Sequence, residues 1–277
     1  MSESSTATLL EVLQRRFPDS SKTTLRQMLQ NDRVRVNGAP ERDAKRAIAS
    51  DDRVEVVGKS ERLDPRVRIL FEDDDLIVID KAAGLLSVAT AEVRFETAEA
   101  FLNKYLAPRE VVVVHRLDRD TSGVLVFAKN SWTRERLQER FAVHDIDRVY
   151  IAVVHGKPKP PAGTLRSFLA EDRDLRVRSV PDDEGKEAIT HFRTIASGRR
   201  FSMLEVTLET GRRNQIRVQL AEAGHPIVGD TMYGRGRDES LDRLGLHAKV
   251  LGFIHPRTGK KVTFTAEPPR EFRELEL

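Results

Sequence analysis

The residues best able to do chemistry gather in one short segment, HRLDRDTSG at positions 115–123. Three basic side chains, two carboxylates and two hydroxyls occupy these nine positions. A carboxylate held beside arginines stays ionised and can act as a nucleophile or stabilise positive charge on a substrate. Asp118 and Asp120 are both candidates for that role, and residue types alone do not decide between them.

Two apolar runs enclose this segment. Residues 111–114 precede it and residues 124–128 follow it, and both runs are of strand length and rich in valine. The pattern predicts a strand, a loop and a strand, with the loop emerging from a buried sheet. Composition alone favours an ordinary solvated connection, because surface loops are polar. Leu117 favours a held loop, since its apolar side chain should point into the core, and Gly123 closes the loop.

The same nine residues resemble the signature of RNA pseudouridine synthases of the large-subunit rRNA type, the RluA group. In that family the aspartate of this loop is catalytic, and the resemblance implies that role for Asp118. It also implies that Arg116 helps to extrude the target base from its helix. Base flipping costs a few kcal/mol of unstacking, which contacts with the RNA must offset.

Two further segments extend the resemblance. In the strand-like run 147–154, Tyr150 matches a family tyrosine that stacks on the target base and is a candidate acceptor for the proton of carbon five. Without the resemblance, Tyr150 is an ordinary half-buried strand aromatic. In the run 210–220, Arg217 matches an arginine that pairs with the catalytic aspartate. This pairing would orient Asp118 through a bidentate contact and lower its pKa.

Three positions depart from the family pattern. Asn214 and Gln219 stand where histidine is more common, and Ala82 replaces a proline. The first two departures are expected to affect contacts with the substrate rather than the catalytic arginine. The third is expected to make its loop less rigid, because proline fixes the backbone.

The composition excludes several kinds of site. The 277 residues include 47 lysines and arginines against 44 aspartates and glutamates, a formal net charge of +3. This slight excess permits an RNA partner without requiring one. The absence of cysteine excludes disulfides, thiol nucleophiles and cysteine zinc sites, and the seven histidines lack metal-binding spacing. We therefore expect no metal and no cofactor.

The N-terminal sixty residues show the pattern of a small separate module. Residues 9–17 and the segment after Ser20 or Ser21 have helical spacing, and residues 33–36 and 53–57 alternate as strands. This module resembles the RNA-binding domain first described in a small-subunit ribosomal protein, which we call the S-four domain. The resemblance implies a basic RNA-binding face, although a solvated surface has the same composition. The residues expected on that face include Lys22, Arg26, Arg33 and Arg35.

The chain is thus expected to comprise an S-four-like domain at residues 1–58, a linker at 59–66 and a catalytic domain at 67–277. The resemblance implies an α+β class, with a largely antiparallel central sheet in the catalytic domain. Residues 158–163 and 171–186 are expected to form surface loops or a mobile hairpin.

The run 210–220 is expected to lead into a helix that ends at Gly224. Arg213 and Arg217 lie one turn apart at its start, and in the absence of the family match they read as a solvated basic stripe.

The resemblance implies an isomerase that converts specific uridines of structured RNA to pseudouridine with an aspartate nucleophile and base flipping. Large-subunit rRNA is favoured over tRNA, because of the S-four-like domain. No signal peptide is evident, and no apolar run approaches the roughly 20 residues of a spanning helix. A cytoplasmic monomer without membrane contact is therefore expected.

Two alternatives remain at this stage. One is a catalytically silent RNA-binding or ribosome-associated protein that retains the fold. The other is an N-glycosidase in which Asp118 activates water and leaves an abasic site. The joint presence of Asp118, Tyr150 and Arg217 disfavours the silent protein.

Overall fold

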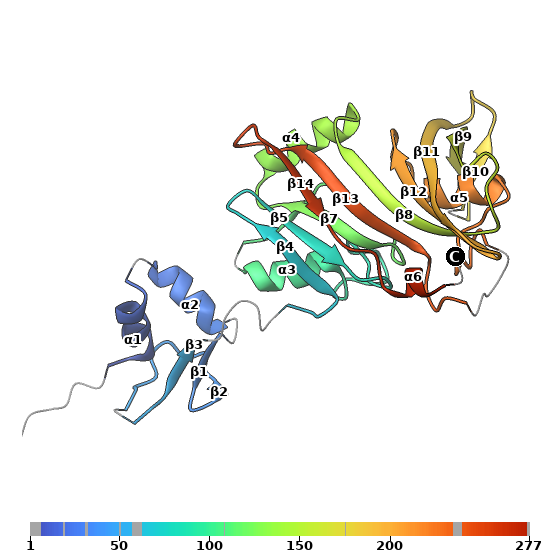
Figure 1. The fold of residues 1–277 in the computed structure, drawn as a ribbon. Coiled ribbons are helices and arrows are strands. Elements are labelled where there is room, and N and C mark those ends of the chain that lie inside the picture. The colour runs from blue at the N-terminus through green and yellow to red at the C-terminus, as the bar shows by residue number, and fades with distance from the viewer. Residues whose placement is uncertain are drawn as a thin grey trace, which may run out of the picture. The chain divides into compact units, whose positions relative to one another are not determined.

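The computed structural model (Figure 1) describes residues 7–18, 20–30, 33–49, 51–56, 63–107, 109–174, 176–234 and 240–275. The chain divides into two compact units. The first comprises residues 1–65 and 99–111, and the second comprises residues 66–98 and 112–277. The first half of the predicted linker at 59–66 lies outside the described residues, which resume at residue 63.

The first unit has the predicted order of two helices followed by a small sheet. Within residues 7–56 its elements are α1 (Leu9–Arg16), α2 (Lys22–Gln30), β1 (Val34–Val36), β2 (Ala39–Pro40) and β3 (Val54–Val56). Thr8 begins α1 with a capping box, and the hydroxyl of Ser21 accepts a backbone N–H in the first turn of α2. Asn37 and Gly38 have φ values of 55° and 82°, which suits the tight turn between β1 and β2.

Apolar side chains from both helices and from β1 form the core of this unit. They include Leu9 and Leu13 of α1, Leu25 and Leu29 of α2, and Val34 of β1. The three strands pair in the order β2-β1-β3 and are antiparallel. The four basic residues expected on the RNA-binding face fall on α2 and around β1. Lys22, Arg26 and Arg35 are exposed, and Arg33 is half-buried.

The second unit is built on an eleven-stranded sheet in the described part of the chain. Its first strands are β4 (Val67–Glu72), β5 (Leu76–Lys81), β6 (Val112–Val113), β7 (Ser122–Ala128) and β8 (Asp147–His155). The later strands are β9 (Ala162–Glu171), β10 (Val177–Val180), β11 (Lys186–Ser197), β12 (Phe201–Leu208), β13 (Leu246–Ile254) and β14 (Lys261–Thr265). The helices that complete the chain are α3 (Ala98–Leu106), α4 (Ser131–Ala142), α5 (Gln215–Glu222) and α6 (Glu271–Glu274).

The sheet is almost entirely antiparallel. Its strand order is β10-β9-β11-β12-β8-β13-β7-β5-β4, with β14 paired to β13 and β6 paired to β7. The single parallel pairing among the described strands joins β13 to β7. The predicted α+β class with a largely antiparallel sheet is therefore confirmed.

One glycine is required where the 115–121 loop runs into β7. Gly123 pairs with Ala248 of β13 and has a φ of 114°. A Cβ at this position would lie 2.1 Å from the carbonyl oxygen of Ala248. Only glycine allows β13 to approach this closely, so it fixes the end of the loop against the sheet.

Two helices pack on the sheet and hold the site. Leu137 of α4 packs with Val124 and Val126 of β7. Ile216 and Leu220 of α5 pack against β8 and β12. In Figure 1, α5 lies at the end of the sheet that carries β9, β10 and β11.

The two segments expected to form surface loops or a mobile hairpin, 158–163 and 171–186, are partly strands. Residues 162–171 form β9 and residues 177–180 form β10, which pair as an antiparallel hairpin, whereas residues 158–161 and 181–185 belong to no strand or helix. Side chains along β9 alternate between exposed and half-buried over most of its length, so the strand lacks the apolar face by which strands are recognised in a sequence. No helix in the described residues is long and apolar enough to cross a membrane.

Candidate active site

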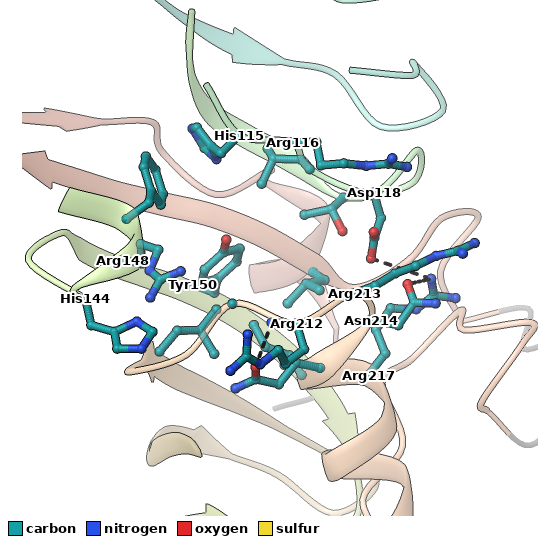
Figure 2. A pocket seen from close by; sticks show the side chains of 18 of the residues that line it. His115, Arg116, Asp118, His144, Arg148, Tyr150, Arg212, Arg213, Asn214 and Arg217 are labelled. Atoms are coloured by element: carbon teal, nitrogen blue, oxygen red, sulfur yellow. Dashed lines mark hydrogen bonds and ion pairs between the residues drawn. The ribbon is translucent and has the colours of Figure 1, made fainter. Parts of the chain in front are cut away.

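One pocket in the second unit brings together the four residues predicted to act on the substrate. It has a volume of about 620 Å³. Asp118 and Arg116 reach it from the 115–121 loop, Tyr150 from β8 and Arg217 from α5 (Figure 2). The basic residues predicted in the first unit do not line this pocket.

The loop that carries Asp118 is tied to the 82–87 segment. The Ser87 hydroxyl donates to the carbonyl oxygen of Leu117 at 2.7 Å and accepts the Leu117 N–H at 3.0 Å. The Leu117 side chain is buried, as predicted. The N–H and the carbonyl oxygen of Leu117, the residue before Asp118, are therefore both held. This limits the positions that the Asp118 carboxylate can reach.

Lys81, at the end of β5, supports the other side of the loop. Its buried ammonium donates to the carbonyl oxygens of Ala82, Leu85 and Arg119, at 3.0, 2.7 and 3.1 Å. Burial lowers the pKa of Lys81 to about 7, against the opposing effect of Asp120. This lysine therefore connects the strand β5 directly to the residue that follows Asp118.

The structure separates the two candidate carboxylates. Asp118 lines the pocket, and its side chain is 26% exposed. Asp120 is exposed and does not line the pocket. A group must reach the substrate to act on it, so the geometry favours Asp118.

Arg217 contacts Asp118, but its bidentate partner is another carboxylate. The distance from its Nη1 to the Asp118 Oδ2 is 3.8 Å. Its Nε and Nη2 each donate to Asp230 at 2.8 Å, and its Nη1 donates to the Asn214 side-chain oxygen at 3.1 Å. The predicted pairing with Asp118 is present, whereas the predicted bidentate geometry belongs to Asp230.

The carboxylate of Asp230 is completely buried and well satisfied. Besides Arg217, the backbone N–H groups of Met232 and Tyr233 donate to it, both at 2.9 Å. Burial favours the protonated form, but these hydrogen bonds outweigh it and hold the pKa of Asp230 below its usual value. Asp230 therefore remains ionised and anchors Arg217.

Asp118 shows the opposite balance. Burial raises its pKa above the usual value, while Arg217, Arg116 and Arg213 oppose the shift. The prediction that Arg217 lowers the pKa of Asp118 is correct for that arginine and wrong for the net shift. The carboxylate is thus more basic than an ordinary aspartate, and its ion pair with Arg217 is a long one.

Tyr150 lies between Asp118 and the opposite end of the pocket, where Arg148 is found, in the view of Figure 2. It shares a face of β8 with Ala152, as the period of two predicts, and packs against the same apolar cluster. Burial raises the pKa of Tyr150 to about 12. Its hydroxyl is therefore protonated at neutral pH, and its ring forms part of the pocket wall.

Comparison with known families agrees with this geometry. The chain matches the family model described as RNA pseudouridylate synthase over residues 75–222, which is more than half of its 277 residues. The chain belongs to the RNA pseudouridylate synthase family. Membership makes it an RNA-modifying isomerase that converts uridine to pseudouridine, as the HRLDRDTSG segment predicted.

Individual relatives extend the similarity over most of the chain. An uncharacterized RNA pseudouridine synthase of Bacillus subtilis is 34% identical over 273 residues, covering 93% of this chain and 89% of the relative. Ribosomal large subunit pseudouridine synthase D of Zymomonas mobilis is 37% identical over 234 residues, covering 78% and 74% respectively. These relatives confirm the predicted RluA type.

A solved structure supports the fold. Human RNA pseudouridylate synthase domain containing 4 has a TM-score of 0.63 and 24% identity, and the similarity covers 74% of this chain and 90% of the human one. This likeness shows that most of the chain has the fold of that structure.

Two departures from the RNA pseudouridylate synthase pattern have different surroundings. Asn214 lines the pocket and accepts a hydrogen bond from Arg217. The position at which asparagine stands in place of histidine is therefore part of the site. Gln219 is buried and does not line the pocket. Its Nε2 donates to Ser167 of β9 at 3.0 Å and to the Ala188 carbonyl oxygen of β11 at 2.9 Å, so it stabilises the packing of α5.

Two supporting residues of this pseudouridylate synthase site were missed in the sequence. Lys81 ends a strand-like apolar run, and Asp230 follows a Gly-rich turn. A charged residue at the end of a buried strand, which cannot stay buried unpaired, was the available signal for Lys81. Nothing local in the sequence indicates that Asp230 faces Arg217, because only the packing of α5 brings them together.

Proposed function

We propose that this protein converts a uridine of large-subunit ribosomal RNA to pseudouridine, with Asp118 as the nucleophile and no cofactor. The observation that carries the proposal is the Asp118 carboxylate, which faces Arg217 in the same pocket as Tyr150. A more basic carboxylate is a better nucleophile once it is ionised, and the surrounding arginines keep that form accessible.

The reaction needs little besides these groups. Asp118 acts at carbon one of the ribose while the bond from that carbon to the ring nitrogen breaks. The base then turns and is joined to the ribose through its carbon five. No oxidation and no phosphoryl transfer occur, so the chemistry requires no redox cofactor.

Tyr150 serves as the platform on which the flipped base stacks. Its hydroxyl is protonated at neutral pH, which favours stacking over a role as a phenolate base. Arg116 is exposed at the edge of the pocket, where it can enter the RNA helix as the base leaves. Arg217 orients Asp118 from its fixed position on Asp230.

The choice of ribosomal RNA rests on two supports. Several relatives carry the name ribosomal large subunit pseudouridine synthase D. The first unit also presents exposed basic residues of the predicted S-four-like domain, namely Lys22, Arg26 and Arg35. Such a substrate places the protein in the cytoplasm, where we expect it to act as a monomer.

The test uses unmodified RNA that carries tritium at carbon five of uracil. The wild-type protein should release tritium to water from large-subunit rRNA without added cofactor, and Asp118→Asn should release none. Release from tRNA but not from rRNA would contradict the substrate assignment. Intact RNA chains with pseudouridine exclude a glycosidase, which would leave abasic sites.

Full activity in Asp118→Asn would contradict the assignment of Asp118 as the nucleophile. Binding without any release by the wild-type protein would instead favour a silent RNA-binding protein. Asp120→Asn is the matched control, because it removes the neighbouring carboxylate that does not line the pocket. It should release tritium at close to the wild-type rate.

A further inference from the structure

The end of the pocket opposite Asp118 is dominated by one buried arginine. Arg148 lies on β8 two residues before Tyr150 and is only 7% exposed. Its Nη2 donates to the carbonyl oxygen of Glu209 at 2.7 Å, and its guanidinium lies 5.8 Å from the centroid of the Phe141 ring. A Cβ at position 211, now glycine, would come within 2.4 Å of its Nη1. The guanidinium is therefore confined by its surroundings.

This confined cation has unused hydrogen-bonding capacity. The Nε of Arg148 is buried and has no hydrogen-bond partner among the described residues. The group that holds the guanidinium is a neutral carbonyl oxygen, which does not compensate its charge. A buried donor without a partner costs free energy, and a buried unpaired cation costs more. Because Arg148 lines the pocket, an electron-rich ligand that enters it can compensate the charge of the guanidinium.

A second buried atom of the same pocket also lacks a partner. The Oγ1 of Thr121 is unsatisfied, and Thr121 is only 2% exposed. Five buried side-chain atoms in the described residues have no partner, and two of them belong to residues that line this pocket. Buried polar groups that lack a partner are therefore found around this pocket, and a polar ligand is the kind of group that such a site accommodates.

Burial indicates which part of an RNA this arginine meets. Arg116, Arg212 and Arg213 also line the pocket, but all three are exposed and suit the solvated phosphates of the backbone. Arg148 lies inside, beside Tyr150, on which the base is proposed to stack. The ligand of Arg148 is therefore the base of the flipped nucleotide rather than a phosphate.

The isomerisation creates a negative charge on that base. When the bond from ribose carbon one to ring nitrogen one breaks, its electron pair leaves with the uracil and spreads over the ring nitrogen and the carbonyl oxygens. Carbon five then bonds to the ribose and loses its proton, and ring nitrogen one gains a proton. The charge is transient, so a fixed cation near the carbonyl oxygens would lower the barrier.

We propose that Arg148 is a further catalytic residue, which donates a hydrogen bond to a carbonyl oxygen of the departing uracil and stabilises its negative charge. This inference rests on the proposed function, since it requires the same reaction in the same pocket. It assigns opposite tasks to the two ends of the pocket: Asp118 acts on the sugar, and Arg148 acts on the base.

The test compares two target bases in Arg148→Met, which keeps an apolar chain of similar length but removes the charge and the donors. The substrate is a fragment of rRNA with ³²P next to the uridine that the wild-type protein converts, prepared with uridine or 5-fluorouridine at that position. Single-turnover loss of the target nucleotide is followed by digestion and thin-layer chromatography.

Fluorine withdraws electrons and stabilises the departing base without help from the protein. Arg148→Met should therefore slow the loss of uridine by about 10²–10³-fold and slow the loss of 5-fluorouridine at least about tenfold less. A merely structural role would slow both substrates equally, and that result would overturn the proposal.

Arg212→Met is the matched control at the exposed part of the same pocket. It should weaken RNA binding and affect both substrates to the same degree. If melting shows that Arg148→Met does not fold, Arg148→Lys makes the comparison, because it keeps the charge and loses the fork. A smaller loss with the same relief by fluorine supports the proposal, and equal losses contradict it.

Failure of this inference is distinct from failure of the proposed function. A wild-type protein that converts neither base would contradict the proposed reaction itself. An active wild-type protein whose Arg148 variants lose equal rate on both bases would contradict only the role of Arg148.

Discussion

Two segments each bring a carboxylate to Arg217, and the surroundings of the two carboxylates are opposite in character. On the 115–121 loop, Asp118 approaches to 3.8 Å, is 26% exposed and has a raised pKa. In the turn after α5, Asp230 is fully buried, receives two hydrogen bonds from Arg217 and two from backbone N–H groups, and has a lowered pKa. One carboxylate is saturated with donors, and the other is left short of them.

The difference separates positioning from reaction. Arg217 depends on Asp230 for its place, so it stands ready whether or not Asp118 contacts it, and such preorganisation is what favours a transition state. Burial of Asp118 disfavours its ionised form, and the nearby arginines compensate that cost only in part. A group that must form and break interactions during a reaction cannot also be saturated with stable ones.

The largest effect should come from removing the reactive carboxylate. Asp118→Asn should lower the single-turnover rate by more than about 10⁴-fold, because the amide is not a nucleophile. The same variant should not lower the melting temperature at neutral pH. A raised pKa means that the ionised form of Asp118 destabilises the fold once the pH exceeds its unfolded value, and asparagine removes that charge. Calorimetry checks this, and a markedly lower melting temperature would contradict the comparison.

Removing the saturated carboxylate should destabilise the fold. Asp230→Ala leaves Arg217 buried without its partner, and breaking a buried pair costs about 3–5 kcal/mol. Denaturant unfolding measures this loss. Glu171→Ala is the control, because it breaks the exposed pair with Arg213, in which the side chains are 37% and 41% exposed, and should cost less than about 1 kcal/mol. Equal losses in the two variants would show that Asp230 is no special anchor.

The pH dependence of kcat/KM should sharpen the contrast. The ionised form of Asp118 is the active one, so kcat/KM should rise with pH through a value above that of an ordinary aspartate and then level off. The Tyr150 hydroxyl, with a pKa of about 12, stays protonated on that plateau. If its phenolate were the required base, the rate would keep rising about tenfold per pH unit into the alkaline range. A flat profile at neutral to mildly alkaline pH is therefore expected.

The sequence predicted the loop that carries Asp118 better than it predicted the residues that support this loop and Arg217. The segment HRLDRDTSG lies between two strand-like runs, and Leu117 and Gly123 indicated a held loop; the structure shows all of these features. This loop is local, so its pattern is visible in consecutive residues. The α+β class was implied by the family resemblance that this segment carries.

The supporting residues depend on packing between distant segments. Asp230 meets Arg217 only because α5 and the following turn fold together, and the unsatisfied Nε of Arg148 follows from how Glu209 and Phe141 surround it. The bidentate contact was assigned to Asp118 because that carboxylate was the one the family pattern supplied. Strand β9 was missed because half-buried residues alternate along it in place of a clear apolar face.

The smallest effect should come from cations that act at long range. Arg217 is 9% exposed and works through its position, whereas Lys22, Arg26 and Arg35 are exposed and can attract RNA only through a field that salt screens. Their triple replacement by glutamine should reduce the salt dependence of RNA binding by about one unit of slope per lost phosphate contact and leave the single-turnover rate at saturating protein unchanged. Binding titrations at several salt concentrations measure the slope. Arg273→Gln is the control, because Arg273 is exposed, pairs with Glu267 and belongs to the second unit. A slope that falls equally in the control would mean that general charge, rather than an S-four-like face, brings the RNA to the protein.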